Sequence, residues 1–195
     1  DCDSVCNTII RWARNAESRY ICVANVHVLM EAYDSQSFGK IVNEADLTVP
    51  DGMPLVWMLS LKGHRRQSRV YGPALMLSVV EDMEQNSVPI GFYGGAPEAL
   101  NALIVTMRRR YERINIVFYL SPPFRELSAG EEEQIVEQIN LSGARVLFVG
   151  LGCPKQELWM AAHRGKVQAV MIGVGAAFDF HAGVKPQAPL WIQRF

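Results

Sequence analysis

The sequence predicts a doubly wound α/β fold, in which helices cover both faces of a mostly parallel sheet. Short, continuously apolar segments such as 20–24 and 146–149 alternate with segments whose apolar residues recur at helical spacing. Strands that are apolar throughout are typical of parallel sheets, because helices bury them from both sides. No internal repeat or low-complexity linker interrupts the 195 residues, of which 49% are hydrophobic. We therefore expect one Rossmann-like domain over residues 1–195.

In the first half of the chain, helical spacing predicts helices and continuous apolar segments predict strands. Asp34 and Ser35 interrupt the apolar pattern, so two short helices are expected there. Pro50 ends a strand because proline cannot donate to a sheet ladder, and Pro73 suits the first turn of a helix. The expected helices are 4–16, 28–33, 38–45, 54–61 and 73–85, and the expected strands are 20–24 and 47–49.

The second half of the chain repeats a strand, a glycine- or proline-rich loop and a helix. Ser128 and Glu131 have the spacing of a capping box, which places the start of one helix. The last residues, 191–195, are expected to begin a further helix. The expected strands are 89–93, 114–120, 145–149 and 169–174, and the expected helices are 97–111, 128–141 and 155–163.

Composition excludes several classes of protein. The net charge of −1 and pI of about 6.5 provide no overall basic field, so a nucleic-acid partner is not expected. The segments 62–69 and 108–113 carry basic clusters, which are solvated faces or, for the first, a local binding patch. No signal peptide or 18-residue apolar segment occurs. The four cysteines are expected to be reduced thiols of a cytosolic protein.

Two glycine-rich loops, 94–95 and 150–154, each lie between an expected strand and an expected helix. Backbone N–H groups at such a helix start can hold a phosphate, since glycine permits close approach. Each loop alone could be a simple turn, but two at one sheet edge favour a nucleotide or nucleotide-sugar ligand. The Gly-x-Gly-x-x-Gly fingerprint and the phosphate loop are absent, which disfavours a nicotinamide-dependent oxidoreductase.

Asp51 stands between a proline and a glycine directly after a strand. Its carboxylate could act as a general base, bind a metal or form the turn. No second carboxylate is closer in sequence than Asp46, so no metal site is expected. Two further segments leave two interpretations open. Gln156 and Glu157 could contact sugar hydroxyls or favour a helix start, and residues 178–180 could grip a base or ribose or pack in the core.

Several segments together resemble the WecG/TagA/CpsF glycosyltransferases, glycosyltransferase family 26. Each motif is weak alone, but their number and order make an accidental match improbable. The resemblance extends from about residue 20 to the end of the chain. The segments that carry it are 24–27, 43–47, 50–57, 69–72, 93–95, 122–125, 149–157 and 173–179.

The resemblance implies an inverting, metal-independent transfer of a sugar, with no cofactor. The donor would be a UDP-sugar carrying N-acetylmannosamine, its uronic acid, glucose or glucuronic acid. The acceptor would be a polyprenyl-diphosphate-linked saccharide of bacterial cell-surface polysaccharide synthesis, such as teichoic acid or exopolysaccharide. The enzyme would be cytoplasmic and peripheral at the inner face of the plasma membrane.

The resemblance also assigns residues. Asp51 would be the catalytic base, and Asn25, Arg69 and Gln156 would share the active site. The residues expected to bind the nucleotide-sugar are Gly94, Gly95, Gly150, Gly152, Gly175, Phe178 and Asp179.

Members of this family carry a C-terminal appendage that helps to complete the site, contacts the membrane and is tied to a change from oligomer to monomer. This sequence ends where that appendage is expected to start, so we expect it to be part of a longer protein that can form homo-oligomers. The alternative from another class is a non-catalytic nucleotide-binding module that uses the same glycine loops.

Overall fold

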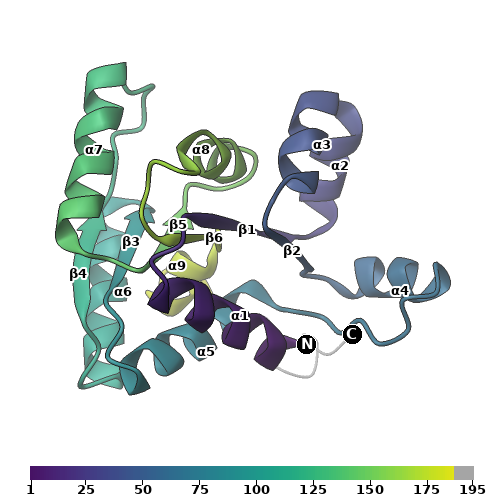
Figure 1. The fold of residues 1–195 in the computed structure, drawn as a ribbon, viewed down its shortest axis with the longest axis horizontal. Coiled ribbons are helices and arrows are strands. Elements are labelled where there is room, and N and C mark those ends of the chain that lie inside the picture. The colour runs from purple at the N-terminus through teal and green to yellow at the C-terminus, as the bar shows by residue number, and fades with distance from the viewer. Residues whose placement is uncertain (187–195) are drawn as a thin grey trace.

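A computed structural model describes residues 1–186 and confirms the doubly wound α/β fold. Its six strands form one sheet in the order β2-β1-β6-β5-β3-β4, and every recorded pair is parallel (Figure 1). The helix expected at 191–195 lies outside the described residues.

The elements alternate along the chain as the sequence predicts. The strands are β1 (Arg19–Ala24), β2 (Leu47–Pro50), β3 (Ile90–Gly94), β4 (Ile116–Leu120), β5 (Val146–Gly150) and β6 (Val170–Gly173). The helices are α1 (Cys2–Arg14), α2 (Val26–Asp34), α3 (Gln36–Asn43), α4 (Met53–Leu61), α5 (Gly72–Gln85), α6 (Pro97–Arg110), α7 (Ala129–Ser142), α8 (Lys155–His163) and α9 (Ala177–His181).

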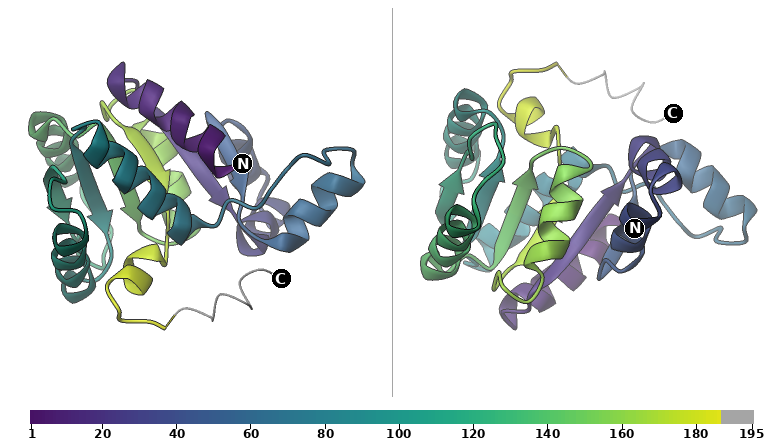
Figure 2. Two further views of the ribbon diagram at one scale, coloured as in Figure 1. Left: turned by 90° about the horizontal axis from the view of Figure 1, so that it is seen from below. Right: turned by 90° about the horizontal axis from the view of Figure 1, so that it is seen from above.

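Helices cover both faces of the sheet, which is why the central strands are apolar throughout. Figure 1 shows α1, α5 and α6 on one side of the sheet and α7, α8 and the α2–α3 pair on the other. Figure 2 shows the two faces separately. Alternate residues of one strand therefore enter different cores: Phe92 packs on the α1–α5–α6 side, and its neighbour Tyr93 packs on the α7–α8 side.

Side-chain caps account for four helix starts in the described chain, those of α1, α2, α3 and α7. The side chain of Ser128 accepts from the N–H of Glu131 and the Glu131 carboxylate accepts from the N–H of Ser128, which confirms the capping box. Ser35 ends α2 and caps α3, which confirms the predicted break. Helix α2 begins at Val26, two residues earlier than predicted, because the Asn25 side chain caps it.

Helix α9 was not predicted. The sequence predicted no element between the strand 169–174 and the last residues, 191–195, but Ala177–His181 is a short helix. Five residues are too few to show a helical period, so no apolar pattern could reveal it. The helix turns Phe178 into the core, where its ring meets Phe92 edge to face at a centroid distance of 5.8 Å.

Candidate functional site

The carboxyl ends of β1 and β2 bring two of the predicted catalytic residues side by side. Ala24 and Pro50 are partners in the parallel register, and the N–H of Asp51 donates to the carbonyl of Ala24 at 2.6 Å. Asn25 and Asp51 therefore follow neighbouring strands at one edge of the sheet. This is the edge where doubly wound proteins bind ligands.

The Asp51 carboxylate is held by two donors. The backbone N–H of Gly72 donates to Oδ2 at 3.1 Å, and the guanidinium of Arg69 lies 3.4 Å from Oδ1. Only 15% of the side chain is exposed, and this burial raises the pKa of the Asp51 carboxyl. The N–H of Gly72 and the charge of Arg69 oppose that rise by stabilising the anion.

Asn25 has a local structural role that the sequence also allows. Its Oδ1 accepts from the N–H of Val28 at 3.1 Å and so caps α2. The residue is exposed, and no hydrogen bond is recorded for its amide nitrogen within residues 1–186. An asparagine at this position thus serves the helix start and stays accessible to a ligand.

The two glycine loops meet at the carboxyl ends of β3 and β5. Gly94 and Gly150 are register partners, and the N–H of Gly95 donates to the carbonyl of Gly150 at 2.9 Å. Their backbones are so close that a β-carbon on Gly94 would lie 2.6 Å from the carbonyl carbon of Gly150. Gly94 is therefore needed for the contact between the loops.

A cleft of about 910 Å³ opens beside these loops. Gly95, Gly150, Gly152 and Gly175 line it, whereas Gly94 is buried beneath it. Other parts of its wall come from the β4–α7 loop and from α8. The cleft is also lined by Tyr93, Lys155, Trp159, Phe178, Asp179 and Lys185.

Phe178 and Asp179 line the cleft in different ways. The Phe178 ring is buried against the glycine loops, and a β-carbon on Gly150 would lie 2.8 Å from it. The Asp179 carboxylate pairs with Lys185 at 2.5 Å. Phe178 thus shapes the floor of the cleft from within the core, and Asp179 fixes a cation at its rim.

Gln156 and Glu157 form a buried pair under the turn that follows β6. The Gln156 amide donates to Oε1 of Glu157 at 2.8 Å, and its own Oε1 accepts from the N–H of Gly175 at 3.1 Å. Burial raises the pKa of the Glu157 carboxyl, while the hydrogen bond from Gln156 opposes the rise. Gln156 thus joins α8 to a turn that lines the cleft.

Glu157→Gln is expected to gain stability over the wild type as the pH rises. The raised pKa means that the folded wild type binds a proton more tightly than the unfolded chain does, so its stability falls as the pH rises through the folded pKa. The neutral glutamine lacks this loss. Urea unfolding at about pH 4 and about pH 8 gives the free energy of unfolding of the variant and of the wild type at each pH. Glu133 is exposed, so Glu133→Gln is the matched control. An equal pH effect in both variants would contradict a raised pKa at Glu157.

None of the four predicted catalytic residues lines the cleft. The turn after β6 lies between the two parts of the site. A β-carbon on Gly72 would lie 3.3 Å from the Asp51 carboxylate and 4.0 Å from the carbonyl of Val174, whose neighbour Gly175 lines the cleft. The acid and the glycine loops are thus adjacent, with one backbone turn between them.

Lys155 and Trp159 line the cleft but had no role in the sequence-based hypothesis. Lys155 begins α8 at the glycine loop, and among residues 1–186 no ion pair engages it. Trp159, one helical turn later, packs on Tyr93 with ring centroids 4.6 Å apart. The i,i+4 spacing of Lys155 and Trp159 was a signal that both face one side of α8.

In the described part of the chain, no cluster of three His, Cys, Asp or Glu side chains could hold a metal ion. No helix within residues 1–186 has the length and apolar content to cross a bilayer.

The strand order and the loops at the carboxyl edge place the chain in the class of doubly wound α/β proteins that bind ligands at that edge. A sequence model described as the glycosyl transferase WecG/TagA/CpsF family matches residues 1–195. The chain therefore belongs to this glycosyltransferase family, which confirms the resemblance seen in its motifs.

Two similar proteins illustrate the relationship. A protein of Bacillus spizizenii is 29% identical over 177 residues, which cover 90% of this chain and 67% of the relative. A protein of Staphylococcus aureus is 28% identical over 177 residues, covering 90% of this chain and 68% of the relative. Both are named N-acetylglucosaminyldiphosphoundecaprenol N-acetyl-beta-D-mannosaminyltransferase.

Proposed function

We propose that this chain is the catalytic domain of an inverting glycosyltransferase that moves a sugar from a UDP-sugar to a polyprenyl-diphosphate-linked saccharide. N-acetylmannosamine is the favoured sugar, because the names of both relatives specify it. The observation that carries the proposal is the largely shielded Asp51 carboxylate, 15% exposed, at the ligand-binding edge of the sheet, in a chain of this family.

Asp51 has the properties of a general base. Its carboxylate is largely shielded from water, and burial raises the pKa, so the anion gains more from accepting a proton than an exposed carboxylate would. In the proposed step an acceptor hydroxyl attacks the anomeric carbon while Asp51 takes the hydroxyl proton. The bond from the anomeric carbon to UDP breaks, and UDP leaves with the bonding electron pair. One displacement inverts the anomeric configuration.

The leaving diphosphate fits the other part of the site. The glycine loops offer backbone N–H groups, and Lys155 supplies a positive charge beside them at the start of α8. Such fixed donors stabilise the charge that develops on the leaving group without needing a metal. In this proposal Arg69 and Asn25, which lie beside Asp51 in the fold, would orient the acceptor hydroxyl.

UDP release tests the proposal directly. The chain is incubated with UDP-N-acetylmannosamine and a short-chain analogue of N-acetylglucosaminyl-diphosphoprenol, with and without EDTA. Transfer of the sugar with UDP release in both conditions is the expected result. UDP binding without release would support the non-catalytic nucleotide-binding module, and loss of transfer in EDTA would overturn metal independence. The same assay with UDP-glucose, UDP-glucuronic acid and the uronic acid of UDP-N-acetylmannosamine identifies the donor.

A further inference from the structure

Helix α4 differs from every other helix of eight or more residues in the described structure, because none of its residues is buried. Its sequence is nonetheless apolar on all sides, with one serine among nine residues. A helix that is apolar all round is ordinarily found inside a core or in contact with lipid. Figures 1 and 2 show that α4 instead projects from the body of the protein.

The exposed side chains of α4 are large. Trp57 is 56% exposed, Met58 is 49% exposed and Leu61 is 89% exposed. Single apolar residues on a surface are ordinary, but three on two turns of one projecting helix form an apolar patch. Tryptophan is also the side chain that favours the boundary between water and lipid.

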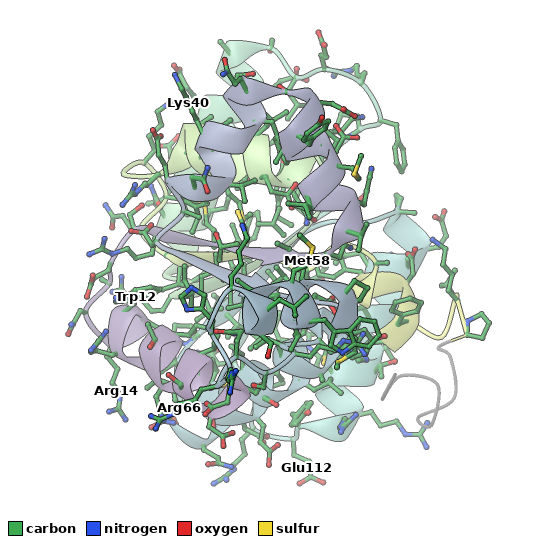
Figure 3. The ribbon with its side chains drawn as sticks, turned by 90° about the vertical axis from the view of Figure 1, so that its right-hand side faces the viewer. Trp12, Arg14, Lys40, Met58, Arg66 and Glu112 are labelled. Atoms are coloured by element: carbon green, nitrogen blue, oxygen red, sulfur yellow. The ribbon has the colours of Figure 1, made fainter. Side chains whose placement is uncertain are left out.

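A basic turn follows this helix immediately. Lys62, Arg65 and Arg66 are all exposed, and within residues 1–186 no ion pair engages any of them. Figure 3 shows Met58 on α4 and Arg66 in the following segment on the same side of the protein. The side chains of an apolar helix and three cations thus lie next to each other, although the whole chain has a net charge of −1.

The segment leaves and rejoins the domain at the candidate catalytic acid. Asp51 directly precedes it, and Arg69 returns to within 3.4 Å of the Asp51 carboxylate. The N–H of Val70 donates to the carbonyl of Pro50 at 2.8 Å, which closes the base of the excursion. A surface that binds α4 would therefore lie close to Asp51.

We propose that α4 and the basic turn 62–66 form a docking surface for an anionic lipid bilayer. The apolar side chains would enter the interface between headgroups and acyl chains, and the cations would contact lipid phosphates. A nine-residue helix is only ~13 Å long, which suits a helix lying in the interface. Two arguments favour lipid over a second copy of the chain. The first is the positive charge of the basic turn. The second rests on the proposed function: a lipid-linked acceptor bound at this surface would bring its reacting sugar near Asp51.

Vesicle co-sedimentation tests the surface. The wild type is expected to bind phosphatidylglycerol vesicles more tightly than phosphatidylcholine vesicles. Trp57→Gln with Met58→Gln is expected to lose at least about tenfold in binding to both, because apolar burial drives insertion. Arg65→Gln with Arg66→Gln is expected to lose roughly 30-fold on the anionic vesicles alone, from about 1 kcal/mol for each cation near the surface.

Matched variants elsewhere on the surface serve as controls. Val105→Gln with Leu141→Gln removes two exposed apolar side chains, and Arg109→Gln with Arg113→Gln removes two exposed cations. Both pairs are expected to bind vesicles as the wild type does. An equal loss in the controls, or no vesicle binding by the wild type, overturns the docking surface. So does an α4 variant that turns an oligomer into a monomer without changing vesicle binding, because a second copy would then cover α4.

The vesicles contain no acceptor, so this result is separate from sugar transfer. Wild-type protein that binds vesicles but transfers no sugar overturns the proposed function alone. If the wild-type protein transfers sugar to the short-chain acceptor but does not bind vesicles, only the proposed docking surface is overturned.

Discussion

Asp51→Asn is expected to lower the rate of sugar transfer by about 10²- to 10⁴-fold, the range for loss of a general base. Asparagine keeps the shape of the side chain and an oxygen that can accept from the N–H of Gly72, so the local backbone has no reason to move. What it lacks is the ability to take the acceptor proton. The loss should therefore appear in kcat, with little change in the affinity for the donor.

Steady-state kinetics of UDP release measure this change, and Asp34→Asn is the matched control. Asp34 is an exposed aspartate at the end of α2, so the same chemical substitution there should leave the rate unaltered. Circular dichroism and donor binding show whether each variant is folded. A folded Asp51→Asn protein with full turnover would remove Asp51 from the catalytic role.

The wild-type rate should also depend on pH in a defined direction. A general base works only when deprotonated, so the rate should rise with pH through the pKa of Asp51. Burial places that pKa above the ordinary value of 3.8. We therefore expect kcat/KM to fall in mild acid at a higher pH than an exposed aspartate would require. Asp51→Asn should lose this acidic limb, and an unchanged profile would assign the limb to another group.

Much of the fold could be predicted because local chemistry marks its elements. The capping box at Ser128, the break at Ser35 and the apolar segment 146–149 of β5 each depend on residues close together in sequence. The carboxyl-edge location of Asp51 and the glycine loops followed from the parallel sheet alone. These predictions needed no knowledge of side-chain packing.

The internal arrangement of the candidate site could not be predicted, because it depends on contacts between distant segments. Gln156 was expected in the active site, but its amide is occupied by Glu157 and by the N–H of Gly175. Gly94 was expected to bind the ligand, but its close contact with Gly150 buries it. The sequence motif contains these residues without showing which of them face a ligand and which hold the loops in place.

Gly94→Ala is expected to destabilise the domain by more than about 3 kcal/mol, a large part of the roughly 5–15 kcal/mol that stabilises a typical domain. Two effects add. The residue has a φ of +117°, which side chains of L-residues rarely adopt, and the new β-carbon would lie 2.6 Å from the backbone of Gly150. Neither backbone can shift to relieve this contact without breaking the sheet ladder, because β3 and β5 pair along their whole length inside the sheet.

Urea unfolding of Gly94→Ala should show this loss, and Gly130→Ala provides a control of opposite sign. Gly130 lies in the first turn of α7 and a β-carbon there meets nothing within 4 Å, so alanine should stabilise the protein by roughly 0.4–1 kcal/mol, because it lowers the entropy of the unfolded chain. If Gly94→Ala unfolds at wild-type urea concentrations and only its affinity for UDP falls, Gly94 contacts the ligand as the family resemblance implies. If stability falls as expected, the sheet requires a glycine at position 94. Gly152, which lines the cleft, is then the better candidate for a phosphate-binding N–H, because the N–H of Gly95 already donates to Gly150.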